Sequence, residues 1–210
     1  MSNRDRILDL SLRLLNEEGA QAAGTTRIAQ TLGISPGNLY YHFKNREEIV
    51  RGLFAALEAE FRAMMIEDVA PPISPARFAG FYLRSFEVAW KYRFFFGGLH
   101  HLLRKDEKLA LAYRDLQAWA LDELEAIVRQ LVKDGSMAKP KTRNGFHSLG
   151  LNTWLIWMNW IRFVQISGKD EVTRDDMIEG VGQMFDLLVP YLDADFEKAA
   201  RRVLARELRG

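Results

Sequence analysis

Hydrophobic residues recur along this chain at the three- and four-residue spacing of an amphipathic α-helix, starting with Ile7, Leu10 and Leu14. This first run predicts a helix over residues 4–18. A longer run predicts a helix over residues 45–68. Beyond residue 75 the same spacing continues, and no alternating period of two indicates a strand. The pattern predicts an all-α protein, whose remaining helices cover about 75–90, 92–104, 106–133, 141–167, 174–191 and 193–208.

Residues 25–46, TTRIAQTLGISPGNLYYHFKNR, predict two short helices that meet at a tight turn. Thr25 or Thr26 is expected to cap the first helix with its side-chain oxygen. Gly33 follows this helix, at a position where a left-handed backbone favours glycine. Ser35 is expected to cap the second helix.

The second short helix is expected to have one buried face and one exposed face. Leu39 and Phe43 lie four residues apart on one face, which predicts that they point inward. A short helix, a glycine turn and an exposed second helix are typical of the helix-turn-helix, whose second helix enters the major groove of DNA. The residues left facing outward are Gly37, Asn38, Tyr40, Tyr41, His42 and Lys44.

Residues 7–54 resemble the DNA-binding domain of the tetracycline-repressor (TetR) family, through ILDLSLRLLNEEG, TTRIAQTLGIS and GNLYYHFKNREEIVRGLF in that order. Residues 92–116, YRFFFGGLHHLLRKDEKLALAYRDL, are more weakly similar to one class of C-terminal domain in that family. The resemblance implies a three-helix helix-turn-helix domain over residues 1–48, connected by the helix 45–68. It also implies a C-terminal helical domain over residues 49–210 that binds an effector and dimerises.

The same resemblance implies which residues meet double-stranded operator DNA. Hydroxyl, imidazole and ammonium groups suit phosphates, which fix the register on DNA without specifying sequence. Gly37 would let the helix approach the bases closely, and Asn38 would either pair with adenine or serve the helix cap. The expected DNA-contacting residues are Thr26, Arg27, Ser35, Gly37, Asn38, Tyr40, Tyr41, His42 and Lys44.

Charge alone does not indicate a nucleic-acid partner. The formal net charge is +1, and residues 1–50 hold six basic and six acidic residues. The DNA prediction therefore depends on where the cations sit, since Arg27, Lys44 and Arg46 bracket the two short helices.

Several classes of function are disfavoured by composition. The chain has no cysteine, which excludes disulfides, thiol nucleophiles and cysteine zinc sites. Adjacent histidines such as His100 and His101 point about 100° apart on a helix, so we expect no metal site and no cofactor. No catalytic motif is present, and we expect no enzyme activity. Because no stretch approaches about 20 uncharged apolar residues, we expect no membrane span and a cytoplasmic protein.

Aromatic residues gather in the middle of the chain, where sixteen of the 24 lie between Phe78 and Phe163. They predict either a packed helical core or the lining of a small-molecule pocket, which is usually apolar with a few polar groups. The candidates for ligand contact are Phe61, Phe86, Trp90, His101, Trp119, Trp154 and Trp157.

Two helices, 141–167 and 174–191, carry apolar residues on more than one face, which predicts contact with a second surface. Thr173 and Asp176 form a capping-box pattern at the start of the second. A homodimer would place two recognition helices about 34–36 Å apart on a pseudo-palindromic operator. The candidate interface residues are Trp160, Phe163, Met177, Val181, Met184, Phe185 and Leu188.

These observations together predict a homodimeric repressor that an unidentified small molecule releases from its operator. The alternative is a DNA-bound adaptor or architectural protein of the same fold that acts through protein contacts without an effector. A cavity of several hundred Å³ would favour the sensor, and a filled core with an exposed apolar patch would favour the adaptor.

Overall fold

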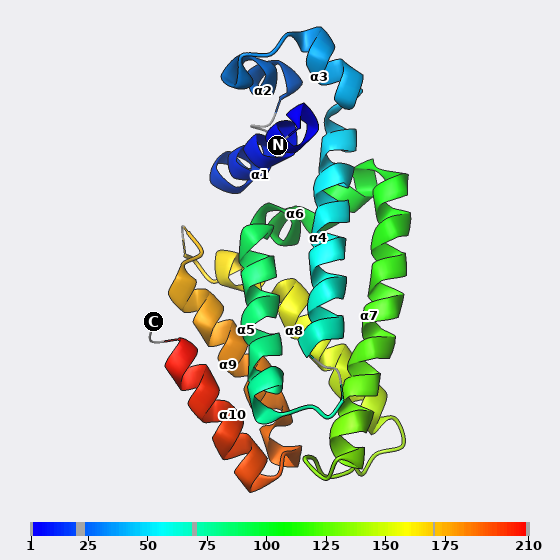
Figure 1. The fold of residues 1–210 in the computed structure, drawn as a ribbon, viewed down its shortest axis with the longest axis vertical. Helices are drawn as coiled ribbons and strands as arrows, with labels where there is room; N and C mark the ends of the chain where they lie inside the picture. Colours follow the sequence, from blue (N-terminus) through cyan, green and yellow to red (C-terminus); the bar gives the residue numbers. More distant parts are fainter. Residues whose placement is uncertain (1, 20–23, 69–70, 170, 209–210) are drawn as a thin grey trace. The chain divides into compact units, whose positions relative to one another are not determined.

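The computed structural model describes residues 2–19, 24–68, 71–169 and 171–208 of the chain, and these residues form ten α-helices and one short 3-10 helix (Figure 1). The all-α prediction is confirmed. The chain divides into two compact units. Unit 1 holds residues 1–59 and 92–112, and unit 2 holds residues 60–91 and 113–210.

Unit 1 contains the two short helices and the elements that support them. Its core is apolar, with Ile7, Ile28, Leu39 and Ile49 at most 1% exposed. Burial of such side chains is the dominant stabilising contribution to the unit. Its helices are α1 (Asn3–Glu18), α2 (Thr25–Leu32), α3 (Pro36–His42), the first part of α4 (Arg46–Asp68), α6 (Arg93–Lys105) and the start of α7 (Glu107–Lys133).

Residues 92–112 belong to the same compact unit as residues 1–59, whereas the resemblance implied a DNA-binding domain over residues 1–48. The amide of Phe94 donates a hydrogen bond to Oδ1 of Asn16 in α1 at 3.0 Å. The guanidinium of Arg51 in α4 pairs with the buried carboxylate of Asp106, which precedes α7. These long-range polar contacts join α6 and the start of α7 to unit 1.

Unit 2 is a bundle in which α9 and α10 both lie against α5, and α8 packs on α9 (Figure 1). Its helices begin and end close to the expected positions, except at the start of α8 and the end of α9. The elements are the end of α4, α5 (Pro75–Lys91), the rest of α7, α8 (Gly145–Ile166), α9 (Arg174–Leu188), η1 (Val189–Tyr191) and α10 (Ala194–Glu207).

Helix α8 begins at Gly145, four residues later than the expected 141. Pro140 folds back against this helix start, and a Cβ at position 145 would lie 2.3 Å from the Pro140 Cβ. Helix α9 ends at Leu188, where the 3-10 turn takes over. Its start carries the predicted capping box, since the Thr173 hydroxyl accepts from the Asp176 amide and the Asp176 carboxylate accepts from the Thr173 amide.

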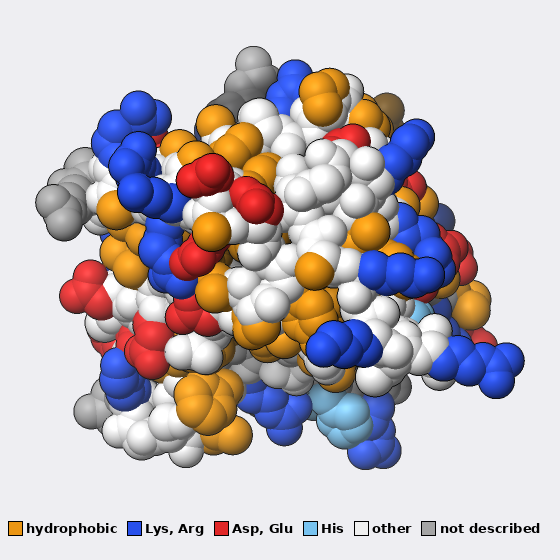
Figure 2. Space-filling view, turned by 90° about the horizontal axis from the view of Figure 1, so that it is seen from below, with side chains coloured by type: hydrophobic (Ala, Val, Ile, Leu, Met, Phe, Trp, Pro, Cys, Tyr) orange, Lys and Arg blue, Asp and Glu red, His pale blue; other side chains and the backbone are white. Residues whose placement is uncertain are grey.

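In the described part of the chain no helix is long and apolar enough to cross a membrane. Figure 2 shows small groups of hydrophobic side chains between basic and acidic ones on the face that it draws.

Candidate functional site

A left-handed glycine closes the turn between α2 and α3. Gly33 has φ 65° and ψ 29°, a conformation that a Cβ makes costly. The amide of Ile34 donates to the carbonyl of Ala29 at 3.0 Å, and the amide of Gly33 donates to that of Gln30 at 3.1 Å. This pair of bonds is the Schellman arrangement, which satisfies carbonyls at the end of α2. The predicted helix-turn-helix is confirmed.

The start of α3 is fixed by its own sequence. The Ser35 hydroxyl accepts a hydrogen bond from the amide of Asn38 at 3.1 Å, and Pro36 takes the first helical position, where no amide is needed. The predicted Ser35 cap is therefore confirmed.

The expected threonine cap of α2 is wrong. Gly24, with extended backbone, occupies the N-cap position, and no side chain caps this helix. Thr25 is already the first helical residue, and its hydroxyl oxygen lies 3.5 Å from the hydroxyl oxygen of Tyr40 in α3. Thr26 is exposed on the first turn of α2. Neither threonine therefore serves as the cap.

Helix α3 turns its aromatic residues outward. The side chain of Tyr41 is 85% exposed and that of Tyr40 is 50% exposed, while Leu39 and Phe43 are buried as predicted. The ring of His42 meets the Tyr41 ring edge to face, with centroids 5.1 Å apart. Hydroxyl and imidazole groups held this way can donate to phosphate oxygens. The other expected DNA contacts that are exposed are Thr26, Arg27, Ser35, Gly37 and Lys44.

Asn38 is half-buried and already has a partner. Its Oδ1 accepts a hydrogen bond from Nδ2 of Asn3 in α1 at 3.3 Å. Asn3 in turn accepts from Nη1 of Arg6 at 3.1 Å. The side chain of Asn38 therefore braces α3 against α1 in the free protein, and it would have to exchange this bond to meet a base.

Arg27 is held by a bidentate ion pair rather than left free. Its two terminal nitrogens donate to the two carboxylate oxygens of Glu18, each at 2.6 Å. The hydrogen bonds from Arg27 lower the pKa of Glu18, and the bonds to Glu18 raise the pKa of Arg27. A phosphate would have to compete with Glu18 for this guanidinium.

Three of the candidate ligand residues form a filled cluster in unit 2. The rings of Phe61 and Trp157 stack with centroids 4.6 Å apart, and Trp154 packs against both. The void beside them measures about 10 Å³. A volume of that size suits at most one water molecule, so this cluster is core in the observed conformation.

The other candidates are dispersed. Trp119 is half-buried with the guanidinium of Arg62 4.1 Å above its ring. His101 is exposed on α6 in unit 1. Phe86 and Trp90, by contrast, both line a hollow in unit 2.

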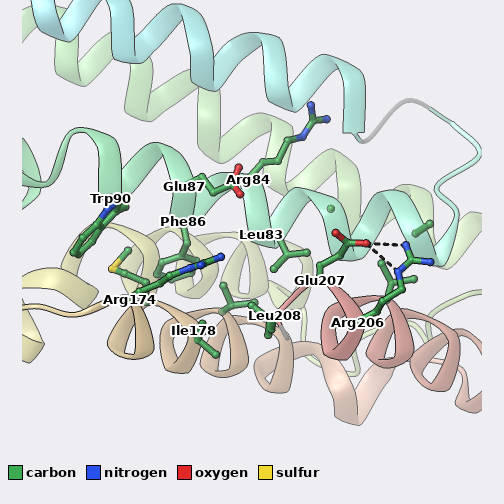
Figure 3. Close-up of a pocket in the computed structure, with 15 residues that line it drawn as sticks. Leu83, Arg84, Phe86, Glu87, Trp90, Arg174, Ile178, Arg206, Glu207 and Leu208 are labelled. Atoms are coloured by element: carbon green, nitrogen blue, oxygen red, sulfur yellow. Dashed lines mark hydrogen bonds and ion pairs between the residues drawn. The ribbon is translucent and has the colours of Figure 1, made fainter. Parts of the chain in front are cut away.

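That hollow is a groove of about 530 Å³ between α5, α9 and α10 (Figure 3). Most of its lining is missing from the expected ligand set, because α9 and α10 come together with α5 only in the fold. The signal available in sequence was the helical spacing of Leu83, Phe86 and Trp90 on α5. We call it the three-helix groove, with apolar lining from Leu83, Phe86, Trp90, Ile178, Val181 and Val203 and a charged margin of Arg84, Glu87, Arg174, Arg206 and Glu207.

The candidate interface residues divide into one exposed side chain and six covered ones. Phe163 is 55% exposed on α8, beside Ile166 at 75% and Leu155 at 47%. The six that are at most 9% exposed within the chain itself are Trp160, Met177, Val181, Met184, Phe185 and Leu188. The sequence pattern marked these six as interface candidates, but in the structure helices of the same chain cover them.

Among the described residues no group of three or more histidine, aspartate or glutamate side chains could hold a metal ion.

Comparisons with known proteins identify the family. The family profile described as "Bacterial transcriptional repressor" (TetR) matches residues 54–199, and the profile of "Bacterial regulatory proteins, tetR family" matches residues 7–53. A crystal structure of a TetR-family transcriptional regulator from Marinobacter aquaeolei VT8 is 30% identical, covers 98% of both chains and superposes with a TM-score of 0.84.

Two curated repressors match over shorter lengths. The tetracycline repressor protein class D of Escherichia coli is 43% identical over 61 residues, which are 29% of this chain and 26% of that protein. The repressor KstR2 of Mycobacterium tuberculosis is 34% identical over 91 residues, which are 41% of this chain and 44% of that protein. The match therefore spans about a quarter of the length of the tetracycline repressor and less than half of the length of KstR2. The two profiles cover nearly the whole chain, and the protein belongs to the TetR family of bacterial transcriptional repressors.

Proposed function

We propose that this protein is a homodimeric repressor that binds a pseudo-palindromic operator through α3 and leaves it when a small molecule binds unit 2. The observation that carries the proposal is the outward face of α3, where two exposed tyrosines and Lys44 follow a capped helix start. The side chains of Tyr41 and Lys44 are exposed within unit 1, and their hydroxyl and ammonium groups suit phosphates. The protein would act in the cytoplasm, where its DNA lies.

Dimerisation is required by the geometry of DNA, because two α3 helices must be about 34–36 Å apart to read two half-sites. We propose the exposed face of α8 as the subunit contact. Leu155, Phe163 and Ile166 present apolar surface there beside the polar residues Asn159 and Arg162. Mixed apolar and polar character of this kind is typical of protein interfaces.

A gel-shift titration with the DNA upstream of the protein's own gene tests the DNA-binding claim. Tyr41→Ala combined with Lys44→Ala should weaken the shift and reduce the slope of log affinity against log salt by about 2, because the dimer loses one phosphate-neutralising cation from each subunit. Lys198→Ala, on the exposed surface of unit 2, is the matched control and should leave both unchanged. The proposal fails if wild type gives no sequence-specific shift or if the double variant binds as wild type does.

The adaptor alternative differs in having no effector. The three-helix groove favours the sensor, because about 530 Å³ lies within the range of sites for organic ligands. A nearly complete switch would require the effector to favour the released state by roughly 5.5 kcal/mol. An adaptor would instead retain the operator in the presence of every small molecule that binds unit 2.

A further inference from the structure

The three-helix groove has an apolar centre and charged ends, which restricts the chemistry of its occupant. Leu83 and Leu208 lie between Trp90 at one end and Arg206 and Glu207 at the other, and Ile178 also lines the groove (Figure 3). Apolar surface of this kind favours an extended hydrocarbon or aromatic body. The charged groups then decide which head group the occupant carries.

Two of the three arginines at the groove already have carboxylate partners. Arg206 donates from Nε and Nη2 to the same oxygen of Glu207, at 3.0 and 2.7 Å. Arg84 pairs with Glu67 of α4 at 3.2 Å. In Figure 3 the side chain of Arg84 extends away from α9, with Glu87 beside it.

Arg174 is different. It is the first residue of α9, and its side chain reaches across the groove toward Phe86 (Figure 3). Within the described part of the chain no carboxylate lies within 4.0 Å of its guanidinium. A guanidinium beside an apolar wall is suited to a carboxylate, which it can bind with two parallel hydrogen bonds.

We propose that the three-helix groove is the effector site and that its ligand is an amphipathic organic anion. The apolar body lies along Leu83, Phe86 and Ile178, and the anionic head is bound by Arg174. This inference rests on the proposed function, because it assigns the place and chemical class of the effector. It also assigns that role to α5, α9 and α10 rather than to the filled cluster around Trp154, whose void of about 10 Å³ holds no organic molecule.

Titration calorimetry on the full-length protein with three ten-carbon probes tests the site. Decanoate carries the anionic head, decyltrimethylammonium a cationic head, and 1-decanol a neutral one. Decanoate should bind once per chain and more tightly than the other two. Arg174→Ala should weaken decanoate binding by at least about tenfold, since the charge-assisted hydrogen bonds to the head group are lost. Arg174→Ala should leave the affinity for 1-decanol unchanged.

Two further variants locate the binding. Leu83→Trp fills the middle of the groove and should abolish decanoate binding. Arg202→Ala removes an exposed arginine of α10 that does not line the groove, and it should bind decanoate as wild type does. Circular dichroism and the thermal midpoint of each variant establish that it is folded. The proposal is overturned if none of the probes binds, if the three bind equally, or if Arg174→Ala or Leu83→Trp binds decanoate like wild type.

A gel shift with the same samples separates this inference from the proposed function. Sequence-specific DNA binding with no decanoate binding overturns the anion site and leaves the DNA-binding function standing. Arg174-dependent decanoate binding that releases no DNA supports the anion site but refutes the effector role. Release of DNA by decanoate from wild type, at a concentration that fails to release it from Arg174→Ala, supports both.

Discussion

Gly180 offers a sharp test of how α9 is held against its neighbours. A Cβ at this position would lie 2.6 Å from Cδ1 of Trp160 in α8 and 2.7 Å from Cε1 of Phe86 in α5. Real Cβ contacts are essentially never this short. The Trp160 ring cannot turn away easily, because its Nε1–H donates to the carbonyl of Asp176 at 2.6 Å. Gly180→Ala must therefore push α9 away from α8 and α5.

The expected magnitude follows from two opposing contributions. Overpacking a core with one methyl group costs typically about 1–3 kcal/mol. Alanine regains about 0.5–1 kcal/mol relative to glycine inside a helix. Gly180→Ala should therefore lower the free energy of unfolding by about 1–2 kcal/mol. At Gly182, two residues further along α9, an alanine Cβ would have no neighbouring atom within 4 Å, so Gly182→Ala should gain about 0.5–1 kcal/mol.

Urea unfolding followed by circular dichroism at the helix band measures both variants. The midpoints should differ by an amount equivalent to about 2 kcal/mol while the slope with denaturant stays constant. Each titration is run at two protein concentrations, because the stability of a homodimer depends on concentration and a contact of Gly182 with a second subunit would show there. If Gly180→Ala is as stable as Gly182→Ala, the close packing of α9 on Trp160 and Phe86 does not hold in solution.

Three further predictions concern single side chains. The ion pair with Lys169, together with hydrogen bonds at the start of α9, lowers the pKa of Asp176 from 3.8 to about 2. The ionised carboxylate therefore stabilises the fold above about pH 4, and this stabilisation is lost as the pH falls to about 2. Asp176→Asn should reduce the change of the urea midpoint with pH between these two values. Glu18→Gln should free Arg27 in each subunit and steepen the salt dependence of DNA binding by about 2 in a gel-shift series, with little change in thermal midpoint because exposed ion pairs are screened. Gly37→Ala should not lower the thermal midpoint, since its Cβ meets only an oxygen 3.9 Å away, but should weaken DNA binding if this position approaches the bases; equal DNA affinity would contradict that role.

The features that sequence predicted well depend on residues close together in the chain. The turn at Gly33 and the cap at Ser35 use hydrogen bonds between residues three to five apart. The capping box of Thr173 and Asp176 is equally local. Such contacts leave the same residue types at the same spacing wherever they occur, so one sequence is enough to find them. The prediction that Thr25 caps α2 was wrong because the helix begins one residue earlier, with Gly24 in the N-cap position.

The features that sequence missed depend on which helices meet. The sequence pattern made Phe86 and Trp154 equal candidates for ligand contact, but helical spacing cannot say that Trp154 is sealed in a cluster while Phe86 lines a groove. That difference is made by α10, which lies about a hundred residues further along the chain from Phe86 and packs on α5. The pairing of Arg27 with Glu18 was hidden for the same reason, since it joins two helices.

Two ion pairs between α5 and α4 connect the three-helix groove to the helix that continues into unit 1. Helix α5 lines the groove on one side, and on another it is tied to the end of α4 by the ion pairs Arg84–Glu67 at 3.2 Å and Lys91–Glu60 at 2.6 Å. The four side chains of these pairs are 40–66% exposed, and exposed ion pairs of this kind contribute at most about 1 kcal/mol each to stability. They fall well short of the roughly 5.5 kcal/mol that a nearly complete switch requires. The remaining 3.5 kcal/mol or so corresponds to burying about 140 Å² of additional apolar surface. At the proposed effector site, most of the differential affinity would therefore come from apolar contacts of α5, α9 and α10 with the ligand's body, and the ion pairs would only relay a movement of α5 to α4.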